Sequence, residues 1–232
     1  MTTSDVTTAL VAGATGGTGR EVLRRAGPRV ETVRALTRSP EATADLRAAG
    51  ADEVVVDDLL DPDDLPAAVD DADVVISAVG SAAAAVRAGP PFVDGAGNRA
   101  LLAAAVDAGV DAFVMESAIG VGPEPASPLA SAFDAFIGPL QEAKAEAEAA
   151  LRDAPIRHTI LRPGILTNGR RTGLVTTAEP GAKLWGAVSR ADVAWLLTAA
   201  TTTEGAANRT FEVVSTPTFP DRGVDLNWTL PR

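Results

Sequence analysis

The sequence contains no cysteine and no tyrosine, and His158 is the single histidine among its 232 residues. Without cysteine, neither disulfides nor thiolate chemistry can contribute to folding or catalysis. A single histidine argues against a histidine-based metal site, and we expect no bound metal. No apolar run reaches the roughly 18 residues of a transmembrane helix. Residues 1–6 also lack the basic-then-apolar order of a signal peptide, so we expect a soluble, cytoplasmic protein.

Lysine is also scarce, because Lys144 and Lys183 are the only two lysines among the 20 basic residues. The net charge is −11 and the sequence pI is about 4.5. Such a balance argues against a nucleic-acid partner, which needs basic patches. An acidic, lysine-poor and alanine-rich chain is typical of salt-loving microbes, where a charged surface stays solvated despite strong screening. An acidic protein from a high-GC bacterium would have the same composition.

What is present begins with a glycine-rich segment that follows a short apolar strand. Gly13, Gly16 and Gly19 have a G-x-x-G-x-x-G spacing and stand between a strand at 8–12 and a helix. Glycine permits a tight turn there and lets backbone N–H groups approach a pyrophosphate at the helix N-terminus. The sequence therefore predicts a dinucleotide-binding turn, with a plain structural turn as the alternative. Its binding residues are expected to be Gly13, Thr15, Gly16, Gly17, Thr18 and Gly19.

Strands and helices alternate along nearly the whole chain. We expect strands at 8–12, 31–37, 53–57, 73–78, 112–116 and 158–162, and helices at 19–26, 40–49, 63–69, 94–108 and 139–153. This rhythm predicts an α/β, Rossmann-like fold, a doubly wound parallel sheet with helices on both faces.

The second half of the chain departs from this rhythm. Residues 1–232 are expected to form one domain, in which 167–232 contribute a small substrate-side lobe. Strands at 173–178 and 209–214 and a helix at 192–200 are expected there. Residues 120–138, rich in Pro, Ser and Ala, are expected to form a lid or a surface excursion.

Several motifs, in this order and spacing, resemble one family. They are GATGGTGR at 13–20, LTRSP at 36–40, DL at 58–59, DP at 61–62, VISAVG at 75–80, VDGAGN at 93–98, EAKAEAE at 142–148, TILRPGILT at 159–167 and SRADVA at 189–194. The chain resembles the atypical short-chain dehydrogenase/reductases. The similarity is to their NAD(P)H-binding branch, close to NmrA-like proteins and flavin (biliverdin-IX-beta) reductase.

The end of the second strand bears on the choice of cofactor. Arg38 stands where an acidic residue would bind the ribose of NAD, whereas an arginine accommodates the extra phosphate of NADP. A guanidinium pairs with phosphate through two parallel hydrogen bonds. The sequence therefore predicts NADP(H) in preference to NAD(H), with a solvated surface arginine as the alternative.

The resemblance implies further cofactor contacts. Asp58 and Leu59 would meet the adenine, although a capping aspartate is an equal alternative for the acidic residues nearby. The small residues Ala78, Val79 and Gly80 would let the ribose and phosphates pass close to the backbone. The turn at Pro163 and Ile165 would hold the nicotinamide carboxamide.

The family's usual catalytic residues are only partly present. Relatives with oxidoreductase activity use a Tyr-x-x-x-Lys pair and a serine, and the lysine lowers the pKa of the tyrosine and holds the nicotinamide ribose. Lys144 fits the lysine position and Ser117 the serine position, but Leu140 stands where the tyrosine would be. A surface ion pair is the alternative for Lys144. Glu116, beside Ser117, could act as a base or pair with an arginine.

Three functional interpretations remain open. An NADPH-dependent reductase could pass hydride to a small acceptor, such as a flavin or a quinone, with only a positioned cofactor and an open apolar pocket. A non-catalytic, NmrA-like redox sensor would only bind the dinucleotide. A sugar epimerase or dehydratase ranks last because those enzymes usually need the tyrosine. The partner is expected to be a small molecule or none, without nucleic acid or membrane, and the chain a monomer or homodimer.

Overall fold

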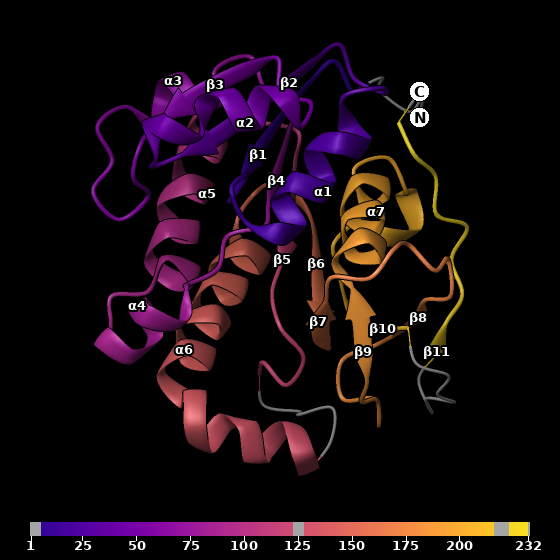
Figure 1. The fold of residues 1–232 in the computed structure, drawn as a ribbon. Helices are drawn as coiled ribbons and strands as arrows, with labels where there is room; N and C mark the ends of the chain where they lie inside the picture. The colour runs from indigo at the N-terminus through magenta and orange to yellow at the C-terminus, as the bar shows by residue number, and fades with distance from the viewer. Residues whose placement is uncertain (1–5, 123–127, 216–222, 232) are drawn as a thin grey trace.

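The computed structural model describes residues 6–122, 128–215 and 223–231 (Figure 1). Its main sheet has nine strands in the order β11-β8-β10-β6-β5-β4-β1-β2-β3. All neighbours from β10 to β3 run parallel, while β8 pairs antiparallel with both β10 and β11 at one edge. The first six strands therefore have the order 3-2-1-4-5-6 of dinucleotide-binding folds, and the predicted fold class is confirmed.

The central strands are apolar and buried on both faces, as expected for a parallel sheet between two helical layers. Successive side chains in β1 alternate between the two cores: Ala9 and Val11 enter one, and Leu10 and Ala12 enter the other. The strands are β1 (Thr8–Ala12), β2 (Thr32–Thr37), β3 (Glu53–Val56), β4 (Val74–Ser77), β5 (Ala112–Glu116), β6 (Arg157–Pro163), β8 (Thr176–Ala178), β10 (Arg209–Val214) and β11 (Gly223–Val224).

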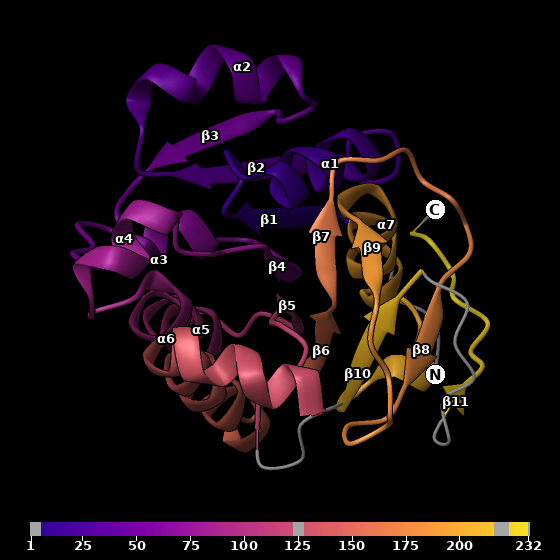
Figure 2. The same ribbon diagram turned by 60° about the horizontal axis from the view of Figure 1, so that its bottom comes forward.

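Helices cover both faces of the sheet (Figure 2). Residues of α1 (Gly17–Ala26), α2 (Thr43–Ala48) and α7 (Arg190–Ala200) pack into the core of one face. Residues of α3 (Leu65–Val69), α5 (Asn98–Asp107) and α6 (Pro128–Asp153) pack into the core of the other face. Shorter helical elements are η1 (Pro40–Ala42), α4 (Ala83–Ala88), η2 (Val93–Gly97) and η3 (Glu204–Ala206). No helix among the described residues has the length and apolar character needed to cross a bilayer.

The expected lid or surface excursion at residues 120–138 stays a prediction, but the expected helix start at Pro139 is wrong. Residues 123–127 lie outside the described residues, but Pro128 already begins α6, which continues through Pro139 to Asp153. A proline suits the first turn of a helix better than its interior, so Pro139 lies against its local preference. The helix packs against η2, α5 and β6.

The region expected to form a small lobe shares its sheet with the core. β10 pairs with β6, and β8 and β11 extend the same sheet. Two strands absent from the sequence expectation, β7 (Ile165–Thr167) and β9 (Ala187–Ser189), form a separate parallel pair. The expected helix at 94–108 begins as the π turn η2 and continues as α5.

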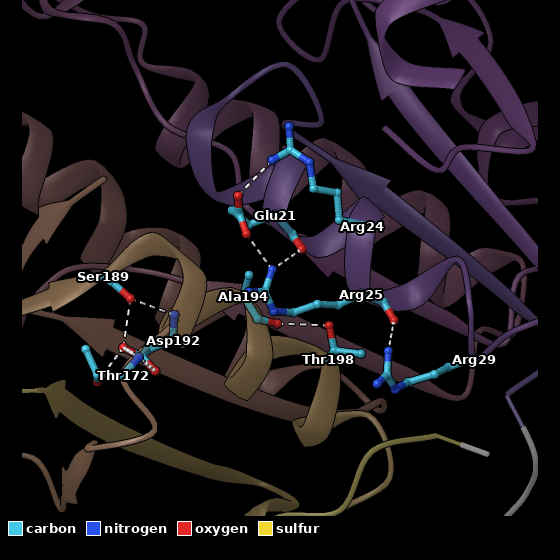
Figure 3. A network of polar contacts seen from close by, with 9 residues as sticks. All are labelled: Glu21, Arg24, Arg25, Arg29, Thr172, Ser189, Asp192, Ala194 and Thr198. Carbon is cyan, nitrogen blue, oxygen red and sulfur yellow. Dashed lines mark hydrogen bonds and ion pairs between the residues drawn. The ribbon is translucent and has the colours of Figure 1, made fainter. Parts of the chain in front are cut away.

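The start of α7 is fixed by a polar cluster (Figure 3). Ser189 caps the helix, because its Oγ accepts from the Asp192 backbone N–H at 3.0 Å. The Asp192 carboxylate accepts the backbone N–H groups of Thr172 and Gly173 at 3.0–3.1 Å, so it ties the segment after β7 to α7. The cluster thereby positions Arg190, the first residue of the helix, over the N-terminus of α1.

Candidate functional site: an open pocket beside buried charge pairs

The glycine turn, residues 13–19, joins β1 to α1 in the form that the sequence predicts. Gly13 has φ +72°, and a Cβ there would overlap the carbonyl oxygen of Ala78 in the neighbouring β4 loop. A Cβ on Gly19 would overlap the carbonyl oxygen of Gly13. The turn closes with a hydrogen bond from the Gly16 N–H to that same oxygen at 2.9 Å. Among the described residues no side chain caps α1, so its N-terminus can receive an anion.

A pocket of about 400 Å³ opens beside this turn, at the carboxyl ends of β1 to β4. This is the edge where open α/β sheets bind dinucleotides, at the point where the strand order reverses. The residues that line it include nine of the predicted cofactor contacts: Gly13, Thr15, Gly16, Arg38, Asp58, Leu59, Ala78, Val79 and Gly80. The other predicted contacts, Gly17, Thr18, Gly19, Lys144, Pro163 and Ile165, are not part of this lining.

Arg38 lies at the rim of the pocket, where β2 ends. Its side chain is exposed and lines the pocket. It forms no hydrogen bond or ion pair with the part of the chain that the structure describes. Asp57, which also lines the pocket, is instead hydrogen-bonded within the protein. Its carboxylate accepts the backbone N–H groups of Asp58, Asp63 and Asp64 at 2.8–3.1 Å and so shapes the pocket wall.

Lys144 is buried on α6, which excludes the surface ion pair weighed from the sequence. Its Nζ lies 2.6 Å from Oδ1 of Asp94, and both side chains are less than a tenth exposed. The other oxygen of Asp94 accepts the backbone N–H of Ser81, a residue of the pocket wall, at 2.8 Å. Burial opposes the charged carboxylate, yet the Lys144 ammonium and Ser81 hold the pKa of Asp94 below its ordinary value.

The π turn η2 brings Asp94 to Lys144, and sequence reasoning missed this role. Gly95 makes the approach possible, because a Cβ there would come within 2.8 Å of the Ala143 carbonyl oxygen on α6. Asn98 anchors the turn from the other side: it accepts from the Ser77 hydroxyl at 2.5 Å and donates to the Asp94 carbonyl at 2.8 Å. The sequence signal for this turn is the VDGAGN motif at 93–98, which does not by itself indicate a contact with Lys144.

Ser117 does not meet Lys144 through a hydrogen bond. It belongs to a charge network made of Ser117, Glu148, Arg152, Arg162 and Glu212, in which all members but the exposed Arg152 are buried. Its hydroxyl donates to Glu148 Oε1 at 2.6 Å, and Arg162 binds both oxygens of Glu148 at 2.6–2.9 Å. Arg162 also binds Glu212 at 3.2 Å. Burial raises the pKa of Glu212 to about 7, and its Oε2 has no partner among the described residues.

Glu116 points to the opposite face of the sheet from Ser117, because successive strand residues alternate. Its Oε1 accepts a hydrogen bond from the Thr18 hydroxyl at 3.1 Å, beneath the glycine turn. The side chain is buried, and this burial raises the pKa of Glu116 to about 7 against the opposing fields of Lys144 and Arg190. The alternative weighed for Glu116, a pair with an arginine, is not present as a hydrogen-bonded contact among the described residues.

Pro163 and Ile165 stand at the end of β6, on either side of Gly164. A Cβ at Gly164 would overlap the Gly186 carbonyl oxygen, so the turn needs glycine to bring β7 beside β9. Ile165 is 49% exposed, and the Ile119 N–H donates to the Pro163 carbonyl at 2.9 Å. Within the described residues, no group of three or more His, Cys, Asp or Glu is placed to hold a metal.

A family model described as NAD(P)H-binding matches residues 13–204 of this chain. The chain belongs to this NAD(P)H-binding family. It is 30% identical over 182 residues to a Bacillus subtilis protein named as an uncharacterized sugar epimerase, YhfK, covering 78% of this chain and 81% of that one.

Solved structures share the fold over nearly the whole chain. One from Bacillus halodurans, provisionally described as an NAD-dependent epimerase/dehydratase, has a TM-score of 0.78 and 26% identity, covering 91% of this chain and 95% of that one. ChuY from Escherichia coli O157:H7, described as an anaerobillin reductase, has a TM-score of 0.76 and 25% identity, covering 92% of this chain and all of that one. These neighbours belong to the atypical short-chain dehydrogenase/reductase and epimerase-like group, as the sequence resemblance predicted.

Proposed function

We propose that this protein is an NADPH-dependent reductase that passes hydride to a small acceptor, a flavin or a quinone, without a tyrosine. The observation that carries the proposal is the open pocket at the carboxyl ends of β1 to β4, with Arg38 at its rim and the glycine turn at its base. Gly13 and Gly19, where an added Cβ would overlap backbone atoms, suit a turn that lies close to a dinucleotide. The reductase among the structural neighbours supports the reaction class.

Arg38 supports NADP(H) as the preferred form. A guanidinium that lies exposed at the rim can form two hydrogen bonds with a 2′-phosphate without breaking an existing ion pair among the described residues. No carboxylate stands at position 38 to bind the ribose hydroxyls of NAD. Asp58, Leu59 and the backbone of 78–80 would hold the adenosine and phosphates on the pocket side.

Lys144 would hold the ribose next to the nicotinamide. Because Asp94 holds it at 2.6 Å and Ser81 holds Asp94, the ammonium is oriented before a ligand arrives. Bound NADPH supplies the hydride, and the chain's own contribution is to bind, orient and keep water away. The Ser117 hydroxyl already donates its proton to Glu148. Toward the molecule that takes the hydride, Ser117 can therefore only accept a hydrogen bond.

A specific observation favours the second candidate, a non-catalytic redox sensor. Both residues at the family's catalytic positions are bound by buried carboxylates, Lys144 by Asp94 and Ser117 by Glu148. A sensor would need only the dinucleotide site. The epimerase name of the sequence relative does not supply the tyrosine that this chain lacks, and we rank that activity last.

The test is anaerobic oxidation of NADPH with a free flavin or a simple quinone as the acceptor. The reductase proposal expects turnover well above the protein-free rate, and a lower rate in Lys144→Met, where the ribose would lose its cation. Tight NADPH binding without turnover on either acceptor would instead favour the sensor. Failure to bind either dinucleotide would reject both.

A further inference from the structure

Glu116 is a buried carboxyl group that the proposed reaction does not use. It ends β5, and strand alternation directs its side chain to the face covered by α1 and α7. The Thr18 hydroxyl, in the first turn of α1, donates to its Oε1 at 3.1 Å. The residue is 7% exposed. An acidic group therefore lies directly below the glycine turn.

The charged groups that act on Glu116 come from three other elements. Lys144 on α6 and Arg190 on α7 favour its ionised form, and Asp94 on η2 opposes it. Lys144 is bound to Asp94, and Arg190 donates to Asn168 at 2.7 Å. Neither cation thus neutralises Glu116 by direct hydrogen bonding, and burial raises the pKa of its carboxyl group to about 7.

The inference rests on the proposed function for the position of the dinucleotide. With the adenosine near Arg38, the pocket covers the carboxyl ends of β1 to β4. A dinucleotide crosses the sheet edge at the point where the strand order reverses, between β1 and β4. Its second half then extends over the glycine turn toward β5, where Glu116 and Lys144 lie.

We propose that Glu116 senses the charge of the nicotinamide ring, so that its carboxylate favours the oxidised dinucleotide and its neutral acid favours the reduced one. The two forms differ by one positive charge on the ring. In a poorly solvated site, a carboxylate attracts that charge strongly. By linkage, binding of NADP⁺ releases a proton from Glu116, whereas NADPH leaves the group protonated. The site would therefore become more selective for NADPH as the pH falls.

The test compares dissociation constants of NADP⁺ and NADPH between about pH 5.5 and pH 8.5. The ratio of the NADP⁺ constant to the NADPH constant should fall by about tenfold as the pH rises, if the ring shifts the Glu116 pKa by one unit. Titration of the phosphate groups is common to both forms and cancels in the ratio. In Glu116→Gln, which keeps an oxygen for Thr18, the ratio should not change with pH.

Glu212→Gln is the matched control, because Glu212 is the other buried carboxyl group with a pKa of about 7 and lies on β10. It should retain the pH dependence of the unaltered protein. Should Glu116→Gln fail to fold, calorimetry of the unaltered protein in two buffers counts the protons directly. NADP⁺ should then release about half a proton more than NADPH near pH 7.

Two results separate this inference from the proposed function. A ratio that is constant with pH in the unaltered protein, equal proton counts for the two forms, or a pH dependence retained in Glu116→Gln would overturn the inference and leave the proposed function standing. Failure to bind either dinucleotide would overturn both.

Discussion

The carboxyl edge of the sheet differs along its length: an open pocket lies over β1 to β4, which we call the open end, and paired, buried charged side chains lie over β5, β6 and β10, which we call the closed end. At the open end, Arg38 is exposed and the wall is made largely of backbone and small residues. At the closed end, Lys144 is bound to Asp94, and Glu148 is bound to Ser117 and Arg162. The half of the edge with the predicted cofactor contacts therefore has space for a ligand, whereas the residues at the predicted catalytic positions are engaged by buried carboxylates.

This contrast gives a rule for variants. Breaking a buried ion pair leaves an unpaired charge in a low-dielectric site, so substitutions at the closed end should appear as losses of stability. Substitutions of exposed side chains at the open end should appear mainly as losses of cofactor affinity, whereas a change at a crowded glycine of the turn should also lower stability.

The largest effect is expected at the closed end, in Glu148→Ala. Removal of this fully buried carboxylate leaves Arg162 without its main partner, and we expect a loss of about 3–5 kcal/mol of unfolding free energy. Chemical denaturation measures it. Glu146→Ala on the same helix is the control, since its pair with Arg99 is exposed and should contribute at most about 0.5 kcal/mol. Similar losses in the two variants would contradict the contrast.

Gly13→Ala probes the base of the open pocket. The substituted residue must keep a φ of +72° and place a Cβ against the Ala78 carbonyl, so we expect a loss of about 2–4 kcal/mol together with loss of NADPH binding. Gly109→Ala has a similar φ of +75° but no atom within 4 Å of the new Cβ, and should cost only about 1 kcal/mol. Thermal unfolding and NADPH titration measure both, and equal costs would show that crowding by Ala78 is unimportant.

Arg38→Ala separates affinity from stability. NADPH should bind about 10- to 100-fold more weakly, because a charge-assisted pair with the 2′-phosphate is lost, while NADH binding should change by less than about twofold. Fluorescence titration measures both constants. Arg87→Ala, an exposed arginine on α4 outside the pocket lining, should leave both unchanged. An equal loss for NADPH and NADH in Arg38→Ala would contradict recognition of the phosphate.

The most gradual expected effect is a pH dependence of stability from the two buried carboxyl groups. Burial raises the pKa of Glu116 and of Glu212 from 4.5 to about 7, so the folded state binds more protons than the unfolded state between these values. Stability should therefore be highest near pH 4.5 in this window and fall by about 2–3 kcal/mol for each group as the pH rises to 7. Urea unfolding at several pH values measures the slope. Glu116→Gln and Glu212→Gln should each flatten it, and a slope unchanged in both would exclude these groups as its source.

The open end could largely be predicted from the sequence. The glycine spacing, the strand before it and Arg38 are local signals, and neighbouring parallel strands bring their carboxyl ends to one edge. β1, β5 and β10 have the expected bounds because their apolar runs are bounded by turn residues. Nine of the predicted contacts line one pocket, although their contacts with a cofactor stay a prediction.

The closed end could not be predicted in the same way. Lys144 was identified from its motif, but its partner Asp94 lies 50 residues earlier and reaches it only through a π turn that close packing of Gly95 on Ala143 permits. The pairing of Glu148 with Arg162 depends on how α6 lies over β6. Such contacts depend on tertiary packing. The helix α6 also continues through Pro139, although proline prefers the first turn of a helix to its interior.

In the proposed reaction, the open end holds NADPH and the tyrosine-free site passes the hydride to the acceptor. A single-turnover experiment tests this proposal: the protein is saturated with NADPH under anaerobic conditions and mixed rapidly with a free flavin or a quinone. We expect the reduced-nicotinamide absorbance of the bound cofactor to be lost faster than that of free NADPH with the same acceptor. A bound NADPH whose absorbance decays no faster than the protein-free mixture would contradict it.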